Sequence, residues 1–380
     1  MKFVVTKSAI EKAAKNLCRV INPKNALPIL ADIMCDVREQ DKVVLMTASD
    51  GEVWITITIG LTEAEGGGKF CVNANSLNDA ISQLTEQPVT IIADTENGAN
   101  AQFRLEHDSG VTYFPIEDAN EYPEPPEEED ENVLGMPAQK LVAGINAVLW
   151  TSANDELRPT MNGVLFNFEQ EFTDIVASNG HCIMRYRIDN CYGITGQVIV
   201  PKKVANILTK ILQYEDADDE ATVIWNETYC KVVFDETEIH FRLVDGKYPN
   251  YESVTPKDQP WWAVVDRDNL MSSIKKVKPF TSDASELISC DFDVTSLEVS
   301  GDNFDAAMGA RTKMEATTNV SDRFCIGMKG TMLLKALQHL PYLEVQIWMT
   351  DKQRAVVIQA KTPDHGWNVM ALVMPMMLND

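Results

Sequence analysis

Catalytic and metal sites are mostly built from histidine, cysteine and carboxylate side chains, and their spacing in this chain forms no such site. The five histidines, at positions 107, 181, 240, 339 and 365, include no HExxH pair of metal ligands. The eight cysteines include no CxxC pair. No GxSxG motif or P-loop is present, and Gly66-Gly67-Gly68 precedes a predicted strand instead of a helix that could bind phosphate. We therefore expect no catalytic residues, no metal and no cofactor.

Carboxylates are abundant, but they occur in runs that are typical of solvated surface. Glu121–Glu131 holds seven acids and three prolines, and Glu215–Glu220 holds five acids. A hydrolase that uses these carboxylates is an alternative interpretation, and only their abundance supports it.

The chemistry that the sequence does favour is contact between lysine side chains and phosphate groups. The net charge of −24 by itself argues against binding a polyanion. However, six segments with helical periodicity together carry +10 while the other residues carry −34, the segments being roughly 7–19, 73–85, 138–150, 201–213, 266–278 and 328–340. If these helices share one surface, that surface is positively charged and can bind nucleic acid. Its lysines would contact the phosphate groups and would not read the bases. For any single helix, lysines on an ordinary solvated face are the alternative.

The helical segments recur because the chain repeats a unit of about 127 residues three times, a period typical of tandem globular domains and too long for a solenoid. The stretch 70–74 corresponds to 198–202 and to 324–328, and each ends a β-type run and opens a helix. Likewise, 47–57 with its Asp-Gly turn corresponds to 176–186 with its Asn-Gly turn.

Each repeat combines two helical segments with short runs rich in Val, Ile, Thr and Phe that are separated by turn signals. We therefore predict an α+β fold made of three tandem domains, each with two helices packed on antiparallel sheets. The predicted domains are 1–124, 137–254 and 263–380, joined by an acidic linker at 125–136 and a second linker at 255–262.

No stretch approaches the roughly 18 unbroken apolar residues that a membrane span needs. The N-terminal Met1–Val5 leads directly into a strand-like run without a signal-peptide pattern, and the scattered cysteines are typical of buried thiols in a reducing compartment. We expect a cytoplasmic protein with no membrane partner.

Five stretches in fixed order carry a resemblance to a known family: Leu27–Leu30, Asn162–Phe166, Asn179–His181, Leu243–Tyr251 and Val373–Leu378. On these stretches the chain resembles, over its whole length, the bacterial sliding clamp, the β subunit of DNA polymerase III. The resemblance implies a homodimer that closes head to tail into a ring of six domains, with helices lining a hole for duplex DNA. It further implies a DNA replication processivity factor without catalysis, whose loose phosphate contacts permit sliding.

The resemblance also implies DNA-facing residues. Lys24, Lys202 and Lys203 match such positions of the family. We extend the prediction to the other cations of the basic helices, which are Lys12, Lys15, Arg19, Lys210, Lys275, Lys276 and Lys335. Generic surface lysine is the alternative for each.

A second implied site is an apolar pocket that accepts short peptides from the replicative polymerase, the clamp loader and repair proteins. Carried over by position, it comprises Arg158, Thr160, Met161, Ser178, Gly180, His181, Ile183, Pro249, Val254, Leu372, Met374, Pro375 and Met376. Methionines suit a pocket that repacks around different side chains. Taken alone, Met374 and Met376 could equally be core or strand-end residues, and Pro375 favours an edge strand.

The sequence departs from the family pattern near this pocket. Cys182 and Met377 stand where better-known members often have arginine, and Asn379-Asp380 extend past the usual end. We therefore expect the peptide preference of this pocket to differ from that of those members.

For the subunit contact, we expect the strand near Phe114 to meet the partner's region between Val277 and Phe280, pairing two sheet edges. Phe114 could equally belong to the core. The main competing hypothesis is an acidic three-domain scaffold that recruits proteins and never encloses DNA.

Overall fold

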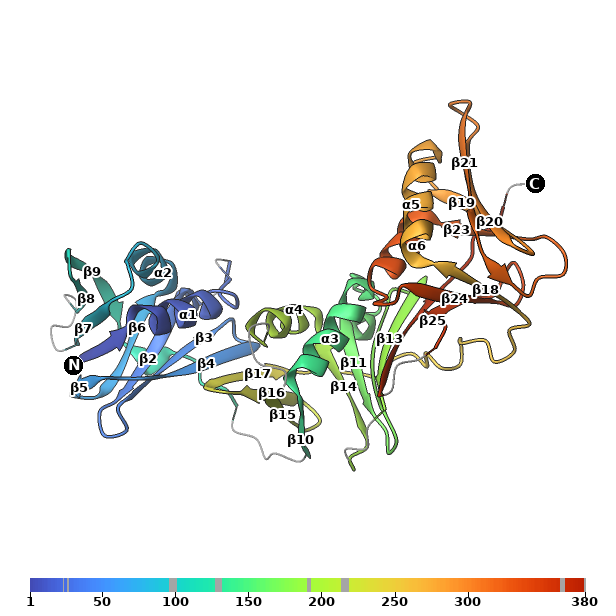
Figure 1. Cartoon of the computed structure of the whole chain (residues 1–380). Helices are drawn as coiled ribbons and strands as arrows, with labels where there is room; N and C mark the ends of the chain where they lie inside the picture. Colours follow the sequence, from blue (N-terminus) through green and yellow to red (C-terminus); the bar gives the residue numbers. More distant parts are fainter. Residues whose placement is uncertain are drawn as a thin grey trace. The chain divides into compact units, whose positions relative to one another are not determined.

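The computed structural model describes residues 1–22, 24–25, 27–95, 101–126, 132–189, 193–212, 219–362 and 366–378. The chain divides into two compact units (Figure 1). Unit 1 comprises Met1–Gln139 and Lys210–Leu243, and unit 2 comprises Lys140–Thr209 and Val244–Asp380. Residues 127–131 and 215–218 of the two predicted acidic runs, together with Cys191, His365 and Asn379-Asp380, lie outside the described residues.

The six predicted helical segments are confirmed, each a few residues shorter than its periodic pattern. They are α1 (Lys7–Leu17), α2 (Ala74–Ser82), α3 (Ala138–Val148), α4 (Lys202–Ile211), α5 (Arg267–Val277) and α6 (Gly330–Gln338). The predicted cap Asn73 begins α2, because its side chain accepts a hydrogen bond from the Ser76 amide at 3.2 Å. Asp266 begins α5 in the same way, accepting from the Asn269 amide at 2.7 Å.

Unit 1 is built on one antiparallel sheet of thirteen strands in the order β10-β15-β16-β17-β4-β3-β2-β6-β9-β8-β7-β1-β5. The strands are β1 (Lys2–Thr6), β2 (Asp32–Arg38), β3 (Val43–Ser49), β4 (Val53–Gly60), β5 (Glu63–Glu65), β6 (Gly68–Asn73), β7 (Pro88–Asp94), β8 (Gln102–His107), β9 (Gly110–Glu117), β10 (Asn132–Pro137), β15 (Glu220–Trp225), β16 (Tyr229–Phe234) and β17 (Thr237–Arg242). Helices α1 and α2 contact each other and pack on this sheet (Figure 1).

Unit 2 contains a nine-stranded sheet, β14-β11-β12-β13-β26-β25-β24-β18-β22, and a four-stranded sheet, β21-β20-β19-β23. The strands are β11 (Gly163–Phe168), β12 (Thr173–Ser178), β13 (Cys182–Ile188), β14 (Gly196–Pro201), β18 (Trp261–Asp266), β19 (Leu287–Asp293), β20 (Ser296–Asn303), β21 (Met308–Glu315), β22 (Thr317–Thr318), β23 (Phe324–Lys329), β24 (Glu344–Met349), β25 (Val356–Ala360) and β26 (Trp367–Val373). Helices α5 and α6 contact each other and the strands of this unit. The predicted α+β class is confirmed.

Sheets continue from one repeat into the next. Strand β4 of the first repeat pairs with β17 of the second, and β13 of the second pairs with β26 of the third. Hydrogen-bonded strand pairs therefore connect neighbouring predicted domains. The boundaries of these domains stay predictions.

The cores are apolar, and the predicted burial of the thiols is confirmed for Cys35, Cys71, Cys182, Cys230 and Cys290. Burial raises the pKa of Cys71 and that of Cys290 to about 12, so these thiols stay protonated. Within the described part of the chain, no helix is both long and apolar enough to cross a membrane.

Candidate nucleic-acid and peptide interfaces

The predicted DNA-contacting cations lie on or beside the helices, away from their buried faces. In α1 the buried residues Ile10, Ala13, Ala14 and Leu17 follow helical spacing, which leaves the lysines of this helix on the solvated side. The exposed members of the predicted set are Lys12, Lys15, Lys24, Lys203, Lys210, Lys275, Lys276 and Lys335, while Arg19 and Lys202 are half-buried. Ammonium groups that are exposed on helices are accessible to the phosphate groups of a nucleic acid.

Lys202 differs from its neighbour Lys203. Its ammonium group donates hydrogen bonds to the Ser152 carbonyl at 3.0 Å and to Asn154 Oδ1 at 3.2 Å. Lys202 is therefore engaged by the loop that follows α3, and Lys203 is the more exposed charge at the start of α4.

The predicted peptide-binding residues fall into a buried floor and an exposed rim within unit 2. Ser178, Ile183 and Leu372 stand opposite one another on β12, β13 and β26, and Val357 and Trp348 continue this row on β25 and β24. Paired residues point to the same face of a sheet, so the row forms one apolar surface. Ile183 and Leu372 are 8% and 1% exposed, and Met161 is also buried.

The rim is formed by turns and by the C-terminal segment. Val254 and Met374 are 52% and 40% exposed, and Arg158, Gly180, His181 and Pro249 are exposed as well. The Met374 amide donates to the His181 carbonyl at 2.9 Å, so the segment after β26 is joined to the turn before β13. Thr160, Pro375 and Met376 are half-buried.

Pro375 does not mark an edge strand, and that interpretation was wrong. Strand β26 lies between β13 and β25 and ends at Val373, so Pro375 follows the strand and removes no ladder hydrogen bond. Met376 then donates its amide to the Gly327 carbonyl at 2.8 Å, which fixes the segment against β23.

The turn beside the floor requires a glycine. Gly180 has φ +86°, and Asn179 Oδ1 accepts from the amides of His181 and Cys182, each at 2.9 Å. A Cβ atom at Gly180 would lie 3.1 Å from Nη1 of Arg158, so the guanidinium packs directly over this turn.

A buried polar network that sequence reasoning missed holds the segment that carries Pro249. The Tyr251 hydroxyl donates to Asp174 Oδ2 at 2.8 Å, and Asn167 Nδ2 donates to the same hydroxyl at 3.1 Å. Arg187 donates to both oxygens of Asp174 at 2.7 Å. Burial, and then the Asp174 carboxylate, raises the pKa of Tyr251, so its hydroxyl stays a donor. Arg185 and Arg187, at alternate positions of β13, were the available signal.

The predicted subunit-contact residues differ in exposure. Phe114 on β9 stacks on Phe103 with ring centroids 4.8 Å apart, and Phe280 is 39% exposed. Val277 has no exposed surface, so it packs inside unit 2 and cannot itself contact a partner, contrary to the prediction.

The open sheet edges of the described residues include two that bear on the predicted subunit contact. Residues 110–115 of β9 pair with β8 on one side, while only Ile116 and Glu117 pair with β6 on the other. Strand β21 is the outermost strand of its sheet, and sequence reasoning did not identify it. Among the described side chains, no three His, Cys, Asp or Glu residues lie close enough to hold a metal ion.

Comparison with known proteins identifies the family. Residues 1–124 match the N-terminal domain of the DNA polymerase III beta subunit, and residues 135–250 match its central domain. Beta sliding clamps of Synechocystis sp. and Pseudomonas putida are 21% and 23% identical to this chain, with all of each chain covered.

Solved structures show the same fold over the whole chain. A sliding clamp from Pseudomonas aeruginosa bound to griselimycin superimposes with a TM-score of 0.92 at 22% identity. The DNA polymerase III beta subunit of Thermotoga maritima gives a TM-score of 0.88 at 19% identity, and both comparisons cover 100% of each chain. The chain therefore belongs to the bacterial beta sliding clamps, the non-catalytic processivity subunits of DNA polymerase III.

Proposed function

We propose that two copies of this chain close head to tail into a ring that encircles duplex DNA without reading its sequence. The observation that carries the proposal is the charge distribution, because exposed lysines concentrate on the helices of a strongly acidic chain. The helices would line the hole, and the acidic remainder would repel DNA from the outer wall.

The subunit contact in this proposal uses open sheet edges. The edge of β9, whose Val111 and Tyr113 are 49% and 65% exposed, would pair with the partner's third repeat near Phe280. Pairing would satisfy unpaired backbone groups and cover exposed apolar side chains on both subunits.

The ring is tested by its topology on DNA. We expect a particle of twice 42.4 kDa that, once loaded, stays on a closed circular duplex and is released when the circle is cut. Native mass measurement and gel filtration of the DNA-bound fraction before and after linearisation report both results. Equal retention on circular and linear DNA would contradict enclosure.

Charge reversal on α4 distinguishes the ring hypothesis from the acidic-scaffold hypothesis. We expect Lys203→Glu/Lys210→Glu to weaken DNA binding and to lower the slope of log K against log salt by about 2, since two phosphate contacts are lost. Lys202 is spared because it is half-buried, whereas Lys203 and Lys210 are exposed.

Lys352→Glu, in an exposed turn between β24 and β25, is the control and should leave DNA binding near that of the wild type. If the α4 variant loads and slides normally, the scaffold hypothesis is favoured over the ring.

We further propose that the floor and rim in unit 2 accept short peptides from the replicative polymerase, the clamp loader and repair proteins. An apolar floor beside exposed methionine and valine side chains supports this proposal, because such surfaces bind apolar peptide side chains of varied shape.

A further inference from the structure

Unit 1 contains the same turn that borders the candidate peptide site of unit 2. Gly51 has φ +91° and Gly180 has φ +86°. The Gly51 amide donates to Ser49 Oγ at 2.9 Å, and the Gly180 amide donates to Ser178 Oγ at 3.2 Å. The two turns are therefore equivalent in backbone conformation and in side-chain support.

The strand that follows each turn meets the next repeat in the same register. Trp54 on β4 stands opposite His240 on β17, and Ile183 on β13 stands opposite Leu372 on β26. Trp54 thus occupies in unit 1 the place that Ile183 occupies in the peptide-site floor.

Where the chain leaves each of the two equivalent sheets, its backbone makes the same hydrogen bond to the turn. The Arg242 amide donates to the Glu52 carbonyl at 3.1 Å in unit 1, and the Met374 amide donates to the His181 carbonyl at 2.9 Å in unit 2. Unit 1 therefore repeats the floor and the turn of the candidate peptide site, and its last residues, Arg242 and Leu243, lie where β17 ends, as Met374 does at the end of β26 in unit 2.

The segment that contains Tyr248 and Pro249 in unit 2 corresponds to the segment that contains Tyr122 and Pro123 in unit 1. In unit 1 this covering segment is hydrogen-bonded to the floor. Tyr122 and Tyr248 are each buried, and a proline follows each of them. Trp54 Nε1 donates to the Pro123 carbonyl at 2.9 Å, so the indole spans the space between floor and covering segment. Pro123 is half-buried, whereas the corresponding Pro249 is exposed.

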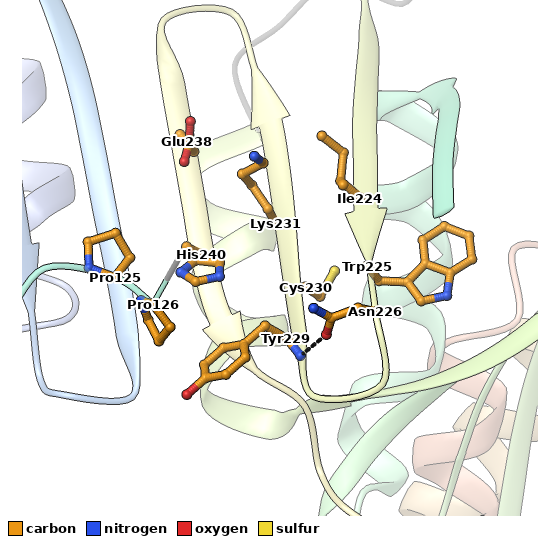
Figure 2. Close-up of a pocket in the computed structure, with 10 residues that line it drawn as sticks. All are labelled: Pro125, Pro126, Ile224, Trp225, Asn226, Tyr229, Cys230, Lys231, Glu238 and His240. Atoms are coloured by element: carbon orange, nitrogen blue, oxygen red, sulfur yellow. Dashed lines mark hydrogen bonds between the residues drawn. The ribbon is translucent and has the colours of Figure 1, made fainter. Parts of the chain in front are cut away.

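The cavity over β15, β16 and β17, next to His240, is too small for a peptide. It measures about 90 Å³ and is lined among others by Pro125, Pro126, Tyr229 and His240 (Figure 2). Ligand pockets usually measure about 300 to 1,000 Å³. Figure 2 shows Pro126 beside His240 at the edge of this cavity.

We infer that unit 1 carries a second copy of the peptide-binding groove, which the Trp54 side chain occupies in cis, so that each chain offers one open groove. The occupant is the indole itself, bonded to Pro123 and 5% exposed. Shortening this side chain would open a site for a short apolar peptide. His240 and Lys231 replace Leu372 and Val357 in its floor, so the opened site would bind the peptide of unit 2 more weakly.

Trp54→Ile tests the inference, since isoleucine is the residue of the open groove. By calorimetry with a polymerase-derived peptide, we expect one peptide per wild-type chain and a second, weaker one in the variant. Two peptides per wild-type chain, or one per chain of the folded variant, would overturn the inference. Trp54→Met is the second variant if Trp54→Ile does not fold, as judged by circular dichroism.

The peptide experiment rests on the proposed peptide site of unit 2. A second measurement, made without peptide, tests the inference independently of that proposal. Release of the covering segment should speed cleavage after Glu121, which the buried Tyr122 follows, by a glutamate-specific protease about tenfold in Trp54→Ile. Trp54→Phe keeps a ring but loses the donor, and about threefold faster cleavage is expected. If the wild type binds no peptide, the proposed peptide site fails, and unchanged cleavage in Trp54→Ile would then overturn the inference by itself.

Discussion

Removal of residues 374–380 is expected to weaken binding of a polymerase-derived peptide at least about 100-fold, because a few anchoring contacts dominate such sites. The deletion removes the exposed Met374 and the half-buried Pro375 and Met376 from the rim. It leaves β26 complete, since this strand ends at Val373. Fluorescence anisotropy with a labelled peptide measures the affinity.

The matched control removes only Asn379 and Asp380 and should bind peptide as the full chain does. Both truncated chains should still form the dimer, because the proposed subunit contact uses β9 and the region near Phe280. An unchanged affinity after removal of 374–380 would exclude this segment from the peptide site.

Asp174→Ala is expected to destabilise unit 2 by about 3–5 kcal/mol, the usual cost of removing one partner of a buried ion pair. Asp174 has no exposed surface, and Arg187 and Tyr251 both donate to it. The Arg185 Nε atom, 4.0 Å from Asp174 Oδ1, is also buried, so the variant leaves two guanidinium groups without their carboxylate. Urea unfolding followed by circular dichroism measures the loss.

Glu124→Gln is the control, since it breaks the exposed Lys69–Glu124 pair of 3.0 Å and should cost less than about 1 kcal/mol. Tyr251→Phe, which removes only the hydroxyl, should cost about 1 kcal/mol and loosen the segment that carries Pro249. A cost below about 1 kcal/mol for Asp174→Ala would mean that the network does not hold unit 2 together.

The residues of the candidate peptide site were predicted by the resemblance to the family, and local sequence predicted only its turn. The Asn179-Gly180 turn was readable because few residues other than glycine adopt a positive φ. The exposure of Met374 was implied by the family and not by its own pattern, since a methionine after an apolar run reads equally well as core. The error at Pro375 arose because proline is excluded from a paired strand, but the sequence alone does not say where the strand ends.

The sequence by itself determined the repeats, the helices with their basic faces and the α+β class, because these depend on periodicity, capping and charge within short segments. Only the tertiary structure decided which strands of different repeats pair, that Val277 is buried, that Asp174 joins Arg187 and Tyr251, and that Trp54 reaches Pro123. These contacts join residues far apart in the chain, and their formation depends on sheet register and side-chain packing, which no local pattern specifies.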